Sequence, residues 1–273
     1  VVGFQENAIS FLLNGDVTEK DGKFYNNTID RQKTTEMPKK KIIQVKRNED
    51  VDVTFFNSLL QSRIEVISLL VSTPNVKVKD SKGNTLKHQI NPIMISSNHT
   101  AASNSAKKIS SEISLLEFEL IFVANLSAMS LTSFTLIQDE NKSMASVYCS
   151  GCMKNEVFNT GNLSEEIAIE NSRMKLNFDK TTGLLKSLKK AQETVDLEIT
   201  FGAYKSKGRA SGAYLFKPDT KKPEITDLLK NLTDYSIVMV RGSITLEVMV
   251  IHNDFILHKI RIFNTNTYLD DAI

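Results

Sequence analysis

The sequence has no tryptophan and almost no net charge. Both features argue against particular kinds of binding partner or site. Its 273 residues carry 34 Lys and Arg against 32 Asp and Glu, a formal net charge of +2. This balance gives no electrostatic reason to expect nucleic acid or an anionic membrane as a partner. Because sugar faces commonly stack on aromatic rings, the lack of Trp also argues against an autonomous sugar site.

Long hydrophobic runs are missing as well. The longest, such as residues 64–71 and 237–240, are far shorter than the roughly 20 residues needed to span a bilayer, so no membrane span is expected. The chain starts at Val1 without a basic and apolar leader, and we expect a cut or processing point there. Its length and 41% apolar content predict one or two domains.

The sequence has only two cysteines, Cys149 and Cys152, in a Cys-Ser-Gly-Cys pair. A redox pair needs a thiolate activated at a helix N-terminus beside a βαβ pattern, which is not found around this pair. A structural zinc site needs four ligands, and there is no second pair to supply them. The pair is interpreted as a loop disulfide or as two inert thiols.

The four histidines do not form a metal-ligand pattern. His252 and His258 share a face only if one strand runs unbroken between them, and they would then be roughly 20 Å apart at about 3.3 Å per residue. His88 and His99 lie in or beside polar segments and are expected to be isolated and exposed.

The carboxylates offer no convincing acid and base pair. Asp270 and Asp271 would face opposite sides of a strand, and Asp219 and Glu224 lie in a lysine-rich loop. All four are interpreted as solvated surface groups. The sequence also lacks a Gly-x-Ser-x-Gly elbow, a His-Glu-x-x-His motif and a phosphate-binding glycine loop.

The residue pattern changes twice in the first half of the chain. Apolar residues at helical spacing over residues 1–15 predict the end of a helical bundle, and residues 16–41 are polar and predict a linker. Residues 42–137 contain short β-branched runs separated by turn clusters, which predict a first β-sandwich domain.

The second half repeats the β pattern after a polar interval. Residues 138–164 are low in hydrophobicity and predict a connector. Residues 165–273 predict a second β-sandwich domain, which we expect to be truncated because its strand pattern is unfinished at the last residue. Within it, residues 179–183 predict a hairpin turn in which Gly183 takes a positive φ. The fold class is therefore all-β, with consecutive β-sandwich domains and a short N-terminal helix end.

Six Asn-x-Ser/Thr triplets would suit passage through the secretory pathway, although a sequence this rich in Asn, Ser and Thr produces several by chance. The candidate glycosylation sites are Asn26, Asn98, Asn125, Asn141, Asn162 and Asn231.

One glycine-punctuated segment, residues 208–219, contains Ser-Gly-Ala-Tyr-Leu-Phe-Lys-Pro. It resembles the Ser-Gly-Ala-Tyr-Leu-Phe-x-Pro signature that follows the catalytic domain of glycoside hydrolase family 38 α-mannosidases. Residues 52–59, 63–74, 170–188 and 201–203 resemble further family segments in the same order. The resemblance extends from about residue 40 to residue 263 and is nearer to the Golgi α-mannosidase II branch than to the lysosomal branch.

The resemblance implies where the chemistry lies. In this family an N-terminal α/β domain holds zinc through Asp and His ligands and supplies an Asp nucleophile, and α-mannosidic bonds are hydrolysed with retention. Retention requires two carboxyl groups about 5 Å apart, which this chain does not convincingly supply. We therefore expect zinc only in the full-length enzyme, with its ligands outside this chain, and no cofactor or catalytic residue within it.

The resemblance assigns one substrate contact, Tyr214, because the Tyr of the family signature hydrogen-bonds the bound sugar. Without the resemblance, a tyrosine packed in a sandwich core with its hydroxyl at the edge is the favoured interpretation. The sequence departs from the family at Arg209 and Ala210, where an acidic and then a basic residue are usual. Ser58 replaces a usual proline, and Lys217 replaces a usual apolar residue.

The resemblance implies that the second domain is similar to the galactose-mutarotase-like supersandwich. It also implies a non-catalytic β portion of an α-mannosidase of N-glycan processing, in the Golgi lumen or secretory pathway. Its expected partners are the N-terminal catalytic domain of the same enzyme and a mannose-containing glycan. The alternative is a stand-alone β-sandwich interaction or carbohydrate-binding module without hydrolase activity.

Overall fold

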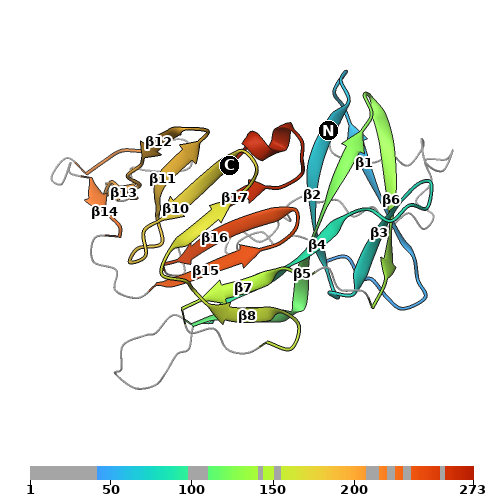
Figure 1. Cartoon of the computed structure of the whole chain (residues 1–273), viewed down its shortest axis with the longest axis horizontal. Helices are drawn as coiled ribbons and strands as arrows, with labels where there is room; N and C mark the ends of the chain where they lie inside the picture. The colour runs from blue at the N-terminus through green and yellow to red at the C-terminus, as the bar shows by residue number, and fades with distance from the viewer. Residues whose placement is uncertain are drawn as a thin grey trace.

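The computed structural model describes residues 42–97, 110–140, 144–150, 155–206, 215–219, 225–229, 235–252 and 256–273 (Figure 1). The expected helix end over residues 1–15 and linker over residues 16–41 lie outside these ranges. The described regular structure consists of β-strands and the 3₁₀ helix η2 (Tyr268–Asp271), so the prediction of an all-β fold is confirmed. Within the described ranges, no helix has the length and apolar character that a membrane crossing requires.

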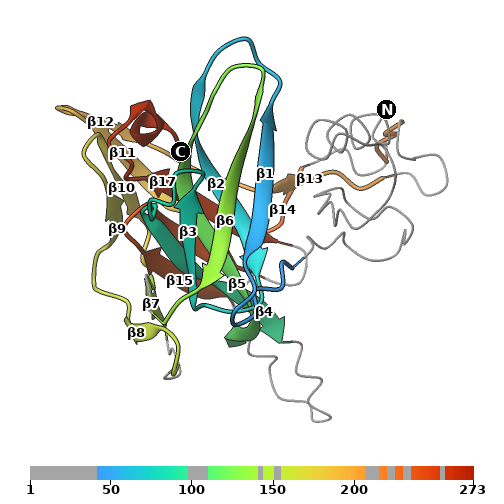
Figure 2. The ribbon, with the colours of Figure 1, turned by 90° about the vertical axis from the view of Figure 1, so that its right-hand side faces the viewer.

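The first β unit consists of two antiparallel three-stranded sheets. One has the order β2 (Arg63–Val71), β5 (Ser110–Leu126), β4 (His88–Ser97). The other has the order β1 (Val51–Asn57), β6 (Ser130–Gln138), β3 (Val76–Asp80). Figures 1 and 2 show this unit at one end of the molecule.

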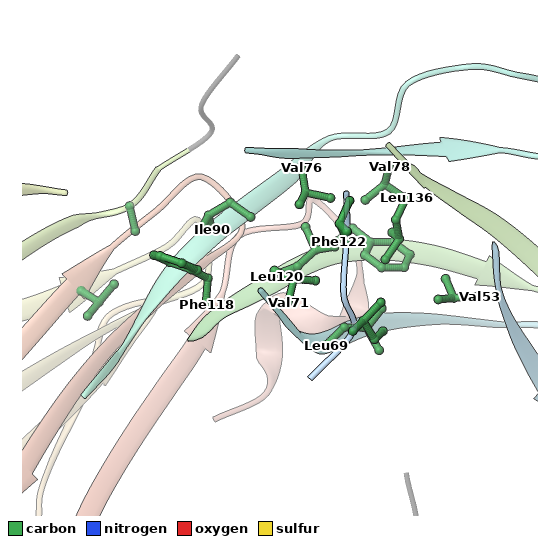
Figure 3. Packing of buried hydrophobic residues seen from close by; sticks show 14 of the residues in the cluster. Val53, Leu69, Val71, Val76, Val78, Ile90, Phe118, Leu120, Phe122 and Leu136 are labelled. Atoms are coloured by element: carbon green, nitrogen blue, oxygen red, sulfur yellow. The ribbon is translucent and has the colours of Figure 1, made fainter. Parts of the chain in front are cut away.

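The core of the first unit follows from the two-residue period of its strands. In β3, Val76 and Val78 are fully buried while Lys77 lies on the opposite face. Side chains from both sheets meet between them, as Figure 3 shows for Phe122 and Leu136. The rings of Phe122 and Phe134 lie edge to face, with centroids 5.2 Å apart.

The second β unit also has two sheets. A five-stranded sheet has the order β17 (Leu257–Phe263), β16 (Thr245–Ile251), β15 (Ser236–Arg241), β7 (Ser146–Cys149), β8 (Asn159–Asn162), in which β7 and β8 are parallel. A four-stranded antiparallel sheet has the order β12 (Glu193–Asp196), β11 (Leu185–Lys190), β10 (Met174–Phe178), β9 (Ile167–Glu170).

Strand β15 contributes to both cores of the molecule. Ile237 and Met239 pack in the core of the second unit, whereas Val238 and Val240 pack in the core that continues from the first unit. A strand covered on both faces needs apolar residues at every position and not at alternate ones. The two units therefore share the five-stranded sheet as a common wall, which explains the continuous apolar run at residues 237–240.

The polar interval at residues 138–164, which the sequence predicts to be a connector, contains β7 and β8. In β7, Val147 and Cys149 are buried beside β15. Each strand has only four residues, too few for their alternation to be detected within a polar stretch. The structure therefore places these strands in the wall between the two cores.

The predicted hairpin turn joins β10 to β11. Asp179 Oδ1 accepts hydrogen bonds from the backbone N–H groups of Thr181 and Thr182 at 2.9 and 2.7 Å. Gly183 has a φ of 70°, as predicted. A Cβ at this position would lie 2.6 Å from Val250 Cγ2 and 2.9 Å from Ile237 Cγ1, so close packing as well as conformation calls for glycine.

A buried polar contact joins β4 of the first unit to the turn between β15 and β16. Gln89 Oε1 accepts hydrogen bonds from the backbone N–H groups of Ile244 and Thr245 at 2.6 and 2.9 Å. Gln89 Nε2 donates to Thr245 Oγ1 at 2.9 Å and to Asn91 Oδ1 at 2.6 Å. Gly242 leaves room for this amide, because a Cβ there would lie 2.0 Å from Gln89 Cδ.

A charged contact lies between the same units. Arg261 of β17 donates from Nε to Glu247 of β16 and from Nη2 to Glu119 of β5, each at 2.7 Å. The Glu247 side chain is fully buried, and the Arg261 side chain is 19% exposed. Burial raises the pKa of Glu119, but the attraction and hydrogen bond of Arg261 outweigh it and hold this pKa below its ordinary value. Burial alone would lower the pKa of Arg261, yet the two carboxylates raise it.

Two glycine substitutions separate conformational strain from crowding. Gly183→Ala and Gly83→Ala both place a side chain at positive φ, but only the former brings a Cβ against neighbouring side chains. Gly83→Ala should cost about 1 kcal/mol of unfolding free energy, and Gly183→Ala about 1–3 kcal/mol more. Urea denaturation of the chain measures both. Equal losses of unfolding free energy in the two variants would mean that the side chains around Val250 can move to accommodate the added Cβ.

The charged contact predicts a specific pH dependence of stability. Because the pKa of Glu119 in the folded protein lies below its ordinary value of 4.5, its contribution is complete above that pH and is lost as the pH falls through the folded value. Glu119→Gln should therefore lower the unfolding free energy by about 1.5–3 kcal/mol at neutral pH, and by progressively less below pH 4.5.

The matched control is Glu65→Gln, because Glu65 pairs with Arg63 at 3.1 Å while both side chains are more than a third exposed. This exposed pair should contribute less than about 1 kcal/mol at any pH. Denaturation curves at several pH values provide the measurement. A loss for Glu119→Gln that does not change with pH would contradict the assignment.

Candidate functional site

The signature segment is attached to the second unit by a paired stalk. Strand β13 (Gly202–Ala203) pairs antiparallel with β14 (Thr226–Asp227), and Ser206 forms an antiparallel bridge with Pro218. Two backbone hydrogen bonds of 2.8 Å extend the ladder, from Asp219 to Lys205 and from Leu228 to Phe201. We call residues 201–206 together with 218–219 and 225–228 the stalk. Figure 1 shows β13 and β14 beyond the sheets, at the opposite end from the first unit.

Tyr214 itself lies outside the described residues, as do Gly212 and Ala213. What the structure describes is the ladder that holds both ends of the connecting segment, residues 207–217. Its bridge at Ser206 and Pro218 brings those ends side by side. Whether Tyr214 contacts a sugar stays a prediction.

The stalk and the residues beside it expose apolar side chains. Leu215 is 65% exposed, Phe216 56% and Ile225 60%. The rings of Tyr204 and Phe216 lie 6.3 Å apart, although both side chains remain about half exposed. A two-stranded ribbon is at best marginally stable by itself in water. Clustered exposed apolar groups commonly mark a surface that contacts another protein segment or a ligand.

The base of the stalk rests on two histidines. The ring of Phe201 lies 6.4 Å from that of His252 and 5.4 Å from that of His258. The estimate of roughly 20 Å between these histidines assumed one unbroken strand. In the structure, β16 ends at Ile251 and β17 begins at Leu257, so a hairpin brings both histidines to the same ring. The sequence signal for this reversal is Asn253-Asp254, two residue types that are common in turns.

Burial favours the neutral form of both histidines at the stalk base. Burial lowers the pKa of His252, with a further contribution from His258, and burial also lowers the pKa of His258. His252 is 3% exposed, and among the described residues neither of its ring nitrogens has a hydrogen-bond partner. This pair therefore acts mainly as a packing surface for Phe201.

Two other histidine predictions have different outcomes. His88 was predicted to be exposed, but it is buried in β4, where its Nδ1 lies 3.0 Å from the carbonyl oxygen of Leu86. The prediction failed because polar neighbours in sequence do not reveal which face of a strand is covered. His99 lies outside the described residues.

The prediction that Asp270 is a solvated strand residue is wrong. It lies in η2 with its side chain fully buried, and its carboxylate accepts hydrogen bonds from Thr265 and Asn266. Burial raises the pKa of Asp270, but these hydrogen bonds more than offset it, so the pKa stays below its ordinary value. Asp271 is paired with Lys190 at 2.8 Å. Neither carboxylate is arranged to act as an acid or a base.

A zinc site does not fit the described residues. They contain no group of three or more His, Cys, Asp or Glu side chains that could hold a metal ion. The described histidines at the stalk base have no nearby carboxylate cluster to complete a ligand set.

The modification sites remain largely predictions. Cys149 is disulfide-bonded, while Cys152 lies outside the described residues. Of the six candidate glycosylation sites, Asn125 in β5 and Asn162 in β8 are described, and both are exposed. The other four, which lie outside the described residues, are Asn26, Asn98, Asn141 and Asn231.

The structure also reveals a cavity that sequence reasoning missed, which we call the seam cavity. Its volume is about 510 Å³, and it lies where β2 and β5 of the first unit meet β17 of the second. Its lining residues are Ser68, Glu119, Lys259, Ile260, Arg261, Phe263 and Ile273. The feature of the sequence that could have indicated this cavity is a single charged residue within an apolar strand, as in Phe118-Glu119-Leu120 and Ile260-Arg261-Ile262.

The chain is similar to curated proteins along most of its length. It is 29% identical to alpha-mannosidase 2 of Spodoptera frugiperda over 275 residues, which is 96% of this chain and 24% of that protein. It is 26% identical to alpha-mannosidase 2 of Homo sapiens over 243 residues, 84% of this chain and 19% of that protein. Against the lysosomal alpha-mannosidase of Mus musculus it is 23% identical over 64% of this chain. The chain thus spans about a quarter or less of these relatives.

A family comparison locates the match within the second unit. Residues 169–270 match the glycosyl hydrolases family 38 C-terminal domain, a range that includes the stalk, its histidine base and the β16–β17 hairpin. The domain match therefore assigns residues 169–270 to the glycosyl hydrolases family 38 C-terminal domain, within a chain that is similar to alpha-mannosidases along most of its length.

Proposed function

We propose that this chain is the non-catalytic β portion of an α-mannosidase that hydrolyses α-mannosidic bonds in N-glycan processing. The observation that carries this proposal is the stalk, which holds the two ends of the signature segment side by side at the edge of a family 38 C-terminal domain. The relatives named alpha-mannosidase 2 support a place in the Golgi lumen or secretory pathway.

The exposed apolar side chains of the stalk and of the residues beside it are the contact surface for the catalytic domain. Leu215, Phe216 and Ile225 would each lose water contact on docking, and burial of such a side chain stabilises an interface by roughly 1.5–3 kcal/mol. Docking also supplies the second face that a two-stranded ribbon needs for stability. The N-terminal catalytic domain of the same enzyme is therefore the proposed partner.

Within this arrangement Tyr214 completes the substrate site. Its neighbours Gly212 and Ala213 have little or no side chain, so another surface can approach the backbone closely. The phenol offers one directional O–H donor on a stiff ring, suited to a sugar hydroxyl. Arg209 and Ala210 stand where an acidic and then a basic residue are usual in the family, so the charge pattern next to this tyrosine differs from that of the family.

The catalytic carboxylates and the zinc ligands are proposed to belong to the N-terminal domain. Zinc held there would supply Lewis-acid chemistry to the reaction, and no residue of this chain is proposed as its ligand. The contribution of this chain is positioning, because it holds the Tyr214 segment against the substrate and covers the site from water.

Replacing Tyr214 with Phe in the full-length enzyme tests the substrate contact. Loss of one hydrogen bond that strengthens in the transition state should lower kcat/KM about tenfold, equivalent to about 1.4 kcal/mol. The melting temperature should stay unchanged because the ring is retained. Tyr204→Phe on the stalk is the matched control and should keep full activity. An unchanged kcat/KM for Tyr214→Phe would remove this residue from the site.

A second experiment asks whether the chain has activity of its own. The purified chain should not hydrolyse an aryl α-mannoside, with or without added zinc, because the proposed nucleophile and metal ligands lie elsewhere. The full-length enzyme, assayed in parallel, provides the positive control. Zinc-dependent turnover by the chain alone would contradict the proposed division of labour.

A further inference from the structure

We propose that the seam cavity is a saccharide-binding site, distinct from the site that Tyr214 would complete, and that it grips two neighbouring hydroxyl groups of a sugar ring. The cavity volume of about 510 Å³ lies within the range of roughly 300–1,000 Å³ typical of small-molecule sites. Its lining combines charged donors and acceptors with apolar side chains, which are the two components that a sugar ring requires.

The polar side of the cavity comes from three strands, β17 of the second unit and β5 and β2 of the first. In β17, alternation places Lys259, Arg261 and Phe263 on one face. Opposite them, Glu119 of β5 accepts a hydrogen bond of 2.6 Å from Ser68 of β2. A sugar hydroxyl both donates and accepts hydrogen bonds, so acidic acceptors beside cationic donors suit adjacent hydroxyl groups.

Free hydrogen-bonding capacity remains in this cluster. Arg261 uses Nε and Nη2 for the two glutamates, and within the described part of the chain its Nη1 has no recorded hydrogen-bond partner. Lys259 Nζ lies 3.6 Å from Glu247 Oε1, beyond normal hydrogen-bond length, and the Lys259 side chain is 35% exposed. Both cations can therefore donate to a ligand without breaking the contact between the units.

The charge balance favours a neutral ligand over an anion. Two cations, Lys259 and Arg261, face two carboxylates, Glu119 and Glu247, so the cluster is close to neutral. An anionic ligand would gain attraction from the cations but would be repelled by carboxylates within a few ångströms. A polyol has no net charge, so it is not repelled, and its hydroxyl groups can donate to the carboxylates and accept from the cations of the cluster.

The apolar side of the cavity is supplied by Phe263 and Ile273. The C–H face of a pyranose can pack against such side chains, and a phenyl ring is well suited to it. The polar groups are already held by contacts to Ser68 and between the strands, so binding would cost little ordering of the protein. The described residues that line the cavity include none of the stalk, which lies away from the first unit (Figure 1), so substitutions at the cavity can be tested separately from Tyr214→Phe.

Binding to the complete chain is tested with methyl α-D-mannopyranoside and an α-linked mannotriose, observed by the amide chemical shifts of isotope-labelled protein. The expected result is saturable binding with shifts concentrated at Ser68 and residues 259–263. Lys259→Met, which keeps the aliphatic stem and removes the ammonium group, should weaken binding about fivefold, equivalent to about 1 kcal/mol.

The matched control is Lys77→Met, because Lys77 also forms an ion pair on a strand, at 3.0 Å from Asp139, and its side chain is 28% exposed. This variant should bind as the unchanged chain does. Ser68→Ala, which removes a hydroxyl group next to Glu119, should also weaken binding while leaving the spectrum folded. Tyr214→Phe should have no effect, so failure here and failure of the Tyr214 proposal are distinguishable.

Three outcomes would overturn the proposal. They are the absence of shifts at Ser68 and residues 259–263, equal binding by Lys259→Met and the unchanged chain, and displacement of the sugar by sulfate at the same residues. The last result would show that the cations bind anions and that the hydroxyl pattern is not what the cavity recognises.

Discussion

The arrangement of this molecule depends on one guanidinium group shared by two carboxylates. Arg261 contacts Glu119 of the first unit and Glu247 of its neighbouring strand, in a site where little solvent reaches. Removing Arg261 would leave two buried carboxylates without this partner, and breaking a buried ion pair in this way typically costs about 3–5 kcal/mol. The contact fixes β17 against the first unit. Since the β16–β17 hairpin also carries His252 and His258, it fixes the surface on which Phe201 and the stalk rest.

A shared wall between two cores accompanies this charged contact. Alternate residues of β15 enter different cores, and Gln89 ties the first unit to the turn that follows this strand. Because β15 packs in both cores, a change in the packing of one unit also affects the other. This coupling suits a scaffold whose proposed task is to hold the Tyr214 segment in a defined place.

Local sequence patterns predicted part of this picture, and the failures have a common cause. The β class, the turn at Gly183 and the family segments all depend on neighbouring residues, so they could be read directly. The burial of Asp270 and His88, the strands within residues 138–164 and the meeting of His252 with His258 depend on which distant strand covers which face. Tyr214 was identified by resemblance alone and has no structural description, so its role rests on the experiment.

The sequence by itself determined the secondary-structure class, because alternation and turn chemistry act over a few residues, and it determined the family through collinear segments. The position of the seam cavity and the pairing of its charged residues depend on the tertiary structure alone. Glu119 and Arg261 are 142 residues apart, and each appears in sequence as a charged residue inside an apolar strand. Their pairing requires that β5 and β17 be brought together by the two cores, and no local pattern contains that information.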